Sequence, residues 1–107
     1  MAAIPYDVAE AFVHGKRASR GAFRSDGDSS IWSYNLCLAF RRNNGTGDSW
    51  IEINHPLDGS HNVSATTARH IRALRDVLIR ECTAWATDGE AVTASDLIRG
   101  TRLVVRR

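Results

Sequence analysis

One segment constrains the fold of this chain more than any other. Between Ile31 and Arg42, large apolar side chains occupy every second position. The apolar set is Trp32, Tyr34, Leu36, Leu38 and Phe40, and the alternate set is Ser33, Asn35, Cys37, Ala39 and Arg41. Because successive side chains of a strand point to opposite faces, the pattern predicts one long strand with a single apolar face. That face must pack against another element.

The element that fits this face is a long helix in the second half of the chain. Ser64, Thr66 and Thr67 follow a polar loop from Asn54 to Asn62, and each is a suitable N-cap. From there to about Thr87, apolar residues recur at spacings of three and four, as in an amphipathic helix. They are Ile71, Leu74, Leu78, Cys82 and Trp85, with Val77 on the flank, and Asp88-Gly89 would end the helix.

Shorter signals predict the elements before this pair. Pro5 and the segment 6–14 indicate a short helix that ends at Gly15, because Val8 and Phe12 form an apolar pair one turn apart. A basic loop should follow, then a short strand over 21–25 and a turn at Asp26-Gly27-Asp28.

The elements after the long strand follow from turn residues. The segment 43–48 is rich in Asn and Gly, and 50–54 resumes an extended pattern with Ile51 and Ile53 on one side, so a hairpin is expected. Thr93 or Ser95 would cap a short helical turn, and 101–106 would form a last strand. The predicted fold class is α+β: an antiparallel three- to four-stranded sheet, one long helix packed on one face, and a short N-terminal helix.

The composition bounds the class of protein. A chain of 107 residues that is 43% hydrophobic is expected to form a single domain, 1–107. It contains no apolar run of the ~20 residues that cross a bilayer, and its first residues lack the pattern of a signal peptide. We therefore expect a cytoplasmic protein with no membrane partner. Cys37 and Cys82 belong to no CxxC motif and are expected to be reduced thiols.

Charge gives the candidate binding residues. The net charge is only +2, but of the 14 basic residues all except Lys16 are arginine, which binds carboxylate and phosphate in a bidentate manner. The codon usage of a GC-rich genome would produce the same excess of arginine over lysine. The candidate partner surface consists of Arg41, Arg42, Trp50, Arg69, Arg72 and Arg75. The alternatives are a solvated helix face, on which Arg interleaves with Asp76, and a Trp50 that closes the core instead of stacking on a base.

The histidines are the only other candidates for chemistry. His55, Asp58, Ser60 and His61 bring imidazoles, a carboxylate and a hydroxyl into one loop. Those are ingredients of acid–base catalysis or a metal site, but the spacing matches no metal motif, and we expect a solvated turn. His70 is expected to be a partly exposed residue of the long helix. The sequence therefore predicts no catalytic residue, no metal and no cofactor.

Several short motifs carry a resemblance. They are Phe12-Val-His-Gly-Lys16, Gly21-x-Phe-x-Ser25, Ser33-Tyr34, Ala39-Phe-Arg41 and Thr66-Thr67-x-x-His70. In this layout the chain resembles small uncharacterised proteins of bacteriophages and prophages. The resemblance implies a viral accessory protein in the host cytoplasm, a group in which anti-CRISPR inhibitors act by occupying a surface of a host machine. It supplies no catalytic residue.

Three hypotheses follow. The leading one is a non-enzymatic phage-type protein that binds a host protein or ribonucleoprotein complex and inhibits a defence system such as CRISPR-Cas. The alternative is a nucleic-acid-binding or regulatory domain that uses the same arginines, and the second alternative is a small hydrolase or nuclease based on His55, His61 and His70. An unpaired sheet edge would also allow a homodimer.

Overall fold

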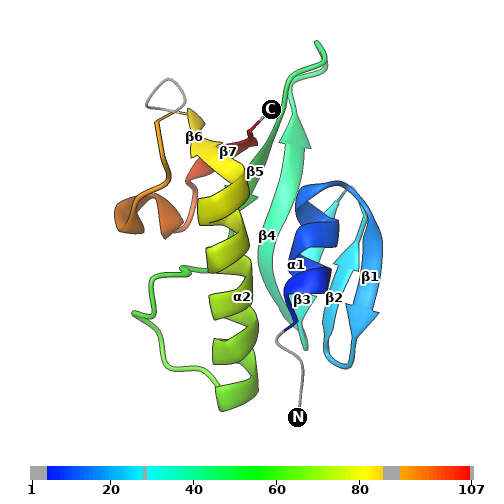
Figure 1. Cartoon of the computed structure of the whole chain (residues 1–107), viewed down its shortest axis with the longest axis vertical. Coiled ribbons are helices and arrows are strands. Elements are labelled where there is room, and N and C mark those ends of the chain that lie inside the picture. Colours follow the sequence, from blue (N-terminus) through cyan, green and yellow to red (C-terminus); the bar gives the residue numbers. More distant parts are fainter. Residues whose placement is uncertain (1–4, 28, 86–89, 107) are drawn as a thin grey trace.

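The fold is α+β, with an antiparallel sheet and two helices (Figure 1). The computed structural model describes residues 5–27, 29–85 and 90–106. Within them the elements are α1 (Tyr6–Val13), β1 (Arg17–Arg20), β2 (Phe23–Asp26), β3 (Ser30–Ser33), β4 (Leu36–Asn43), β5 (Ser49–Ile53), α2 (Ala65–Glu81), β6 (Cys82–Ala84), the 3-10 turn η2 (Ala94–Leu97) and β7 (Arg102–Val105).

The described residues form one seven-stranded sheet in the order β1-β2-β3-β4-β5-β7-β6. The prediction of three to four strands was therefore wrong. Three strands are additional to the predicted ones, because β1 and β6 lie where no strand was expected and one predicted strand is divided in two. The predicted basic loop contains β1, the predicted long strand is the hairpin of β3 and β4, and the end of the predicted long helix is β6.

The predicted long strand is interrupted in two places. At Tyr34, whose φ is 55°, the chain turns back after β3, and the hairpin closes on the pair Ser33 and Leu36. Farther along, Ile31 pairs with Ala39 but Trp32 pairs with Cys37, which leaves Leu38 as the extra residue of a β-bulge. Each interruption reverses which residues of the alternation face the helices.

Because of the two reversals, the apolar residues of the predicted strand do not all lie on the same face of the sheet. Leu38 lies in the core and Leu36 packs against it, but Tyr34 is half-exposed at the turn. Trp32 and Phe40 pair with Cys37 and Ser30 on the face of the sheet that points away from the helices. The prediction of a single apolar face under the long helix was therefore wrong for Trp32, Tyr34 and Phe40.

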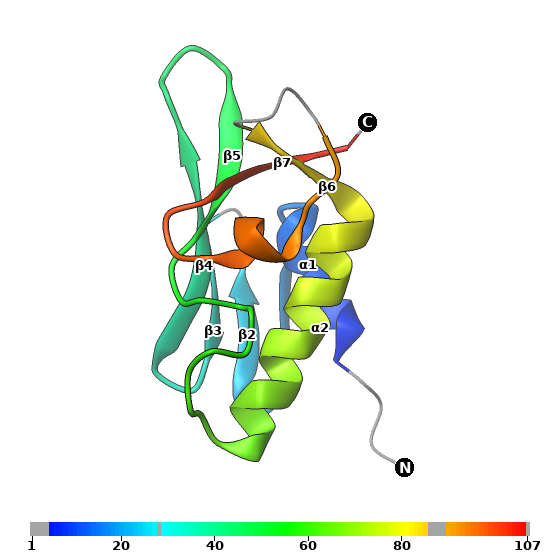
Figure 2. The same cartoon turned by 90° about the vertical axis from the view of Figure 1, so that its left-hand side faces the viewer.

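We call the face of the sheet that meets the helices the core face and the other the open face. In Figure 2 both helices lie on the same side of β3, β4 and β5. One cluster of buried residues joins the helices to the core face, and its largest members include Phe12, Leu74 and Leu78 from the helices and Phe23, Ile31, Leu38, Ile51, Ile53 and Leu103 from the strands. Ile51 and Ile53 lie on one side of β5, as predicted.

The helices differ from their predictions mainly at one end. Ser64 caps α2 by accepting a hydrogen bond of 3.1 Å from the Thr67 amide, and α1 has the predicted bounds to within one residue. However, α2 ends at Glu81, because Cys82 enters β6 and pairs with Val105 of β7. The expectation that Cys82 and Trp85 are helical was therefore wrong, and Asp88-Gly89 lies outside the described residues.

The C-terminal predictions were confirmed. Thr93 is the N-cap of η2, where its amide and its hydroxyl both donate to Asp96 Oδ2 at 2.9 Å, and β7 follows over 102–105. In the residues that the structure describes, no helix has the length and apolar character needed to cross a membrane.

Candidate functional site: arginines over aromatic rings on the open face

The open face carries three arginine–aromatic pairs in one layer. The guanidinium carbon of Arg24 lies 5.7 Å from the centre of the Trp32 ring. That of Arg42 lies 4.9 Å from the Phe40 ring, and that of Arg102 lies 4.7 Å from the Trp50 ring. At such distances a cation is attracted to the negative face of the ring. The outer layer of this face is therefore made of guanidinium groups with aromatic rings beneath them.

Strand register places these residues together, although they are distant in sequence. Residues directly opposite each other in an antiparallel pair share a face. Arg24 is opposite Trp32, and Arg42 is opposite Trp50. Glu52 is opposite both Phe40 and Arg102, one on each neighbouring strand. The pairs therefore extend across the sheet from β2 to β7.

Charge on the open face is positive in sum. Glu52 forms ion pairs with Arg42 Nε at 2.6 Å and with Arg102 Nε at 3.9 Å, and its side chain is only 15% exposed. Arg17 of β1 is opposite Asp26 of β2 in the strand register, and both lie on the same face as Arg24. Among the strand residues that the structure describes on this face, four arginines thus accompany two carboxylates.

Two indole rings meet at one end of the open face, beside a groove. Trp50 is buried, its indole N–H has no hydrogen-bond partner among the described residues, and its ring lies 5.3 Å from that of Trp85. Trp85 is 40% exposed. A groove of about 410 Å³ lies between Trp85 and Arg102, next to Asp96 and Thr101. A groove flanked by an exposed indole and a guanidinium group can receive a side chain of another molecule.

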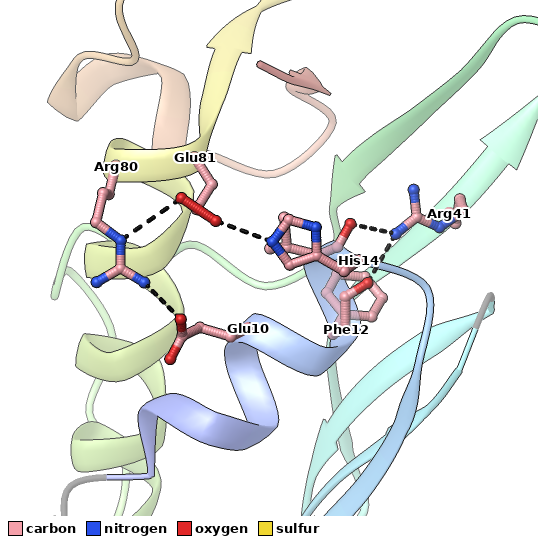
Figure 3. Close-up of polar contacts among 7 residues, drawn as sticks. Glu10, Phe12, His14, Arg41, Arg80 and Glu81 are labelled. Atoms are coloured by element: carbon pink, nitrogen blue, oxygen red, sulfur yellow. Dashed lines mark hydrogen bonds and ion pairs between the residues drawn. The ribbon is translucent and has the colours of Figure 1, made fainter. Parts of the chain in front are cut away.

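The six candidate partner residues from the sequence do not form one surface. Arg42 and Trp50 lie together on the open face, whereas Arg69, Arg72 and Arg75 belong to α2. Arg41 lies on the core face, and its terminal nitrogen donates to the carbonyl oxygens of Phe12 at 2.7 Å and Val13 at 3.0 Å (Figure 3). Their binding role stays a prediction, and Arg41 is engaged with the end of α1.

Charges between the helices are matched within the molecule. Arg80 contacts Glu10 at 3.1 Å and Glu81 at 3.7 Å, and His14 Nε2 donates to Glu81 at 2.9 Å (Figure 3). The hydrogen bond from His14 lowers the pKa of the Glu81 carboxyl group. Arg75 lies 3.8 Å from Asp76. The interleaving of Arg with acids on α2 is therefore partly a set of internal ion pairs.

The histidines separate into a surface pair and a buried residue. The rings of His55 and His61 meet edge-on with centroids 5.2 Å apart. His70 is only 6% exposed, bonds Ser33 Oγ at 2.8 Å and stacks on Phe23 with ring centres 4.4 Å apart. The expectation of a partly exposed His70 was wrong, and burial lowers its pKa. The three histidines do not converge, and the described residues contain no cluster of three metal-binding side chains.

Neither cysteine has the surroundings of a nucleophile. Both thiols are free. Burial raises the pKa of Cys82 to about 12, and burial also raises the pKa of Cys37. A thiol with a raised pKa is a poor source of thiolate. Both behave as small apolar residues.

Sequence reasoning missed most of the open-face layer. Arg24, Trp32, Phe40, Trp85 and Arg102 were not among the candidate partner residues. The only signal for them is the presence of arginine or an aromatic residue in several short extended segments, and cross-strand neighbours cannot be assigned before the register is known. Comparison of this chain with protein-family models, with curated proteins and with solved structures found no match.

Proposed function

We propose that this chain acts by binding a partner protein through its open face, without catalysis. The observation that carries the proposal is the layer of three arginines over aromatic rings, which ends at the half-exposed Trp85. Tryptophan and arginine are the residues most enriched among those that dominate protein–protein affinity. A guanidinium already held over a ring loses less side-chain entropy when a partner binds it.

The chemistry of the face defines the partner surface. Arginines on the open face outnumber carboxylates, so the complementary surface carries acidic groups. The groove beside Trp85 would take one side chain at the end of that surface. The sequence resemblance and the small size support a host defence complex, such as a CRISPR-Cas effector, as the partner, and inhibition by occupying its surface as the action.

The test compares two double variants of matched chemistry. R24E/W85A changes the open face, and R69E/I79A makes the same kinds of change on α2, where Arg69 and Ile79 are exposed. A partner is first isolated from a lysate of the host by affinity purification with nuclease treatment, and is then purified for titration calorimetry. We expect R24E/W85A to weaken binding by at least about tenfold, a loss typical when one arginine and one tryptophan contact are removed, and R69E/I79A to leave it unchanged.

The opposite pattern would remove the proposal. If R24E/W85A binds the purified partner as tightly as the original chain does, the open face is not the contact surface. Circular dichroism of both variants establishes that they are folded, so that a loss of affinity is not a loss of structure.

A second candidate is binding of a single-stranded nucleic acid on the same face. The specific observation in its favour is the excess of four arginines over two carboxylates among the described strand residues there, since bases stack on guanidinium planes and phosphates pair with them. Fluorescence anisotropy with a labelled oligonucleotide of about 15 nucleotides would then show affinity falling about tenfold or more between 50 and 200 mM salt. Absence of binding even at the lower salt would exclude this candidate.

A further inference from the structure

A second pocket lies away from the open face, where the loop between β5 and α2 runs beside the first turns of α2 (Figure 2). Its volume is about 200 Å³. Pockets for drug-sized ligands are larger, about 300 to 1,000 Å³, so this one suits a single small group. Four basic side chains line it: His55 and His61 from the loop, and Arg72 and Arg75 from α2.

The charge of this pocket selects an anion. Among the described residues that line it there is no carboxylate. The nearest acid of the loop, Asp58, accepts a hydrogen bond of 3.0 Å from the Ser60 amide, and hydrogen bonding from Ser60 lowers its pKa. Two guanidinium groups beside two imidazoles would repel a metal cation. The same groups supply forked N–H donors, which match the oxygens of a phosphate.

The position of the proton on the His55 ring adds a further requirement on the ligand. His55 Nδ1 lies 3.0 Å from the carbonyl oxygen of Pro56, and a carbonyl only accepts, so Nδ1 carries the proton. In a neutral ring, Nε2 is then an acceptor. Inorganic phosphate near neutral pH retains one P–OH group, which can donate to such a nitrogen while its other oxygens accept from the arginines. A carboxylate has no such donor.

We propose that His55, His61, Arg72 and Arg75 form a binding site for a phosphate group. The site lies on other elements than the open face and does not depend on the function proposed for that face. The phosphate can be a free ion or the terminal phosphate of a larger molecule such as a nucleic acid strand. Both sources present acceptor oxygens to the arginines, whereas the P–OH donor is retained at pH 7 mainly by the free ion, because a phosphate monoester has a second pKa of about 6.

The first experiment is a titration of the full chain with inorganic phosphate at pH 7, followed by the ¹⁵N and ¹H NMR signals of the imidazole rings. The expected result is a saturable shift of the His55 and His61 signals, with His70 unmoved and with acetate producing no comparable shift. In R72Q/R75Q the affinity should fall about tenfold or more. The matched control is R69Q, an exposed arginine one turn away from Arg72 that does not line the pocket, and it should bind as the original chain does.

Three results would overturn the site. They are an absence of saturable shifts, equal affinity in R72Q/R75Q and the original chain, and a Zn²⁺ titration that moves the same imidazole signals while phosphate leaves them unmoved. R75K guards against an artefact of folding, because it keeps the charge but not the fork and should bind with intermediate affinity.

A second arm distinguishes the two sources of phosphate. A short oligonucleotide with a 5′-phosphate is compared with the same oligonucleotide bearing a 5′-hydroxyl. Binding that is at least about tenfold tighter with the phosphate, and that R72Q/R75Q abolishes, identifies the end of a strand as the ligand. Equal binding of the two oligonucleotides, together with saturable binding of inorganic phosphate, identifies a free phosphate group.

Discussion

Arg41 and Arg42 are neighbours in β4, yet their guanidinium groups lie on opposite faces of the sheet. Arg41 is half-buried on the core face and donates to two carbonyl oxygens at the end of α1. Arg42 is exposed on the open face, where it lies over Phe40 and pairs with Glu52. The same type of side chain therefore has two uses: Arg41 closes the interior on the core face, and Arg42 presents a cation to solvent on the open face.

This contrast shows which basic residues are available for binding. The last carbonyls of a helix have no partner within the helix and must be satisfied from outside. On the core face, Arg41 supplies the hydrogen bonds for two of these carbonyls and is therefore not available to a partner. On the open face, aromatic rings and one carboxylate hold the arginines in place without covering them, so their donors stay accessible to a partner.

The largest expected effect compares one phenylalanine from each face. Phe12 is fully buried between α1 and the core face, so Phe12→Ala should lower the free energy of unfolding by about 3 to 5 kcal/mol. Phe40 is only partly buried on the open face, and Phe40→Ala should cost about 1 to 2 kcal/mol. Urea denaturation of the two variants measures both values. Equal losses would mean that the two faces are not distinct in packing.

The next effect separates the two arginines. Arg41→Ala removes charged hydrogen bonds to the Phe12 and Val13 carbonyls and should cost about 1.5 to 3 kcal/mol. Arg42→Ala removes an ion pair of an exposed arginine and should cost about 1 kcal/mol or less, because Arg102 still lies 3.9 Å from the largely buried Glu52 carboxylate. The midpoint of urea denaturation gives the order. A larger loss for Arg42→Ala would show that their assignment to the faces is reversed.

Much of the fold could be predicted because its signals are local. The capped helices, the hairpin of β4 and β5 and the strand β7 each depend on residues a few positions apart. The split of the segment 31–42 has no such signal, because the alternation of apolar residues continues unbroken in the sequence through the two turn residues, although the turn reverses the face to which they point. The bulge at Leu38 then reverses the alternation again. Register, which depends on the partner strand, decides both features.

His70 offers a test that depends on pH. Burial lowers its pKa in the folded state, so the unfolded state binds the proton first as the pH falls through about 6.5. Its contribution to stability is complete above that pH and is lost progressively below it. The free energy of unfolding should therefore fall between pH 7 and pH 5, and His70→Gln should flatten that slope. The carboxyl groups with lowered pKa values, Asp7 and Glu81, act in a lower range.

The candidate site was less predictable than the fold. Arg42 and Trp50 were named from the sequence because they flank one hairpin. Arg24 and Arg102 lie far away in the chain and join them only through the pairing of β2 with β3 and of β5 with β7. A binding surface assembled from several strands is a property of strand order, which a pattern within one strand does not contain.

The smallest expected effect concerns the turn at Tyr34, which joins β3 to β4. Tyr34 has a φ of 55°, a conformation that costs most residues about 1 to 2 kcal/mol and that glycine adopts freely. Glycine also loses more backbone entropy on folding, so Tyr34→Gly should raise the free energy of unfolding by only about 0.5 kcal/mol. Asn44→Gly, in an exposed loop, is the control and should not stabilise the protein. If Tyr34→Gly is destabilising by more than about 1 kcal/mol, the chain does not turn at Tyr34, and the division of residues 31–42 between the two faces would have to be redrawn.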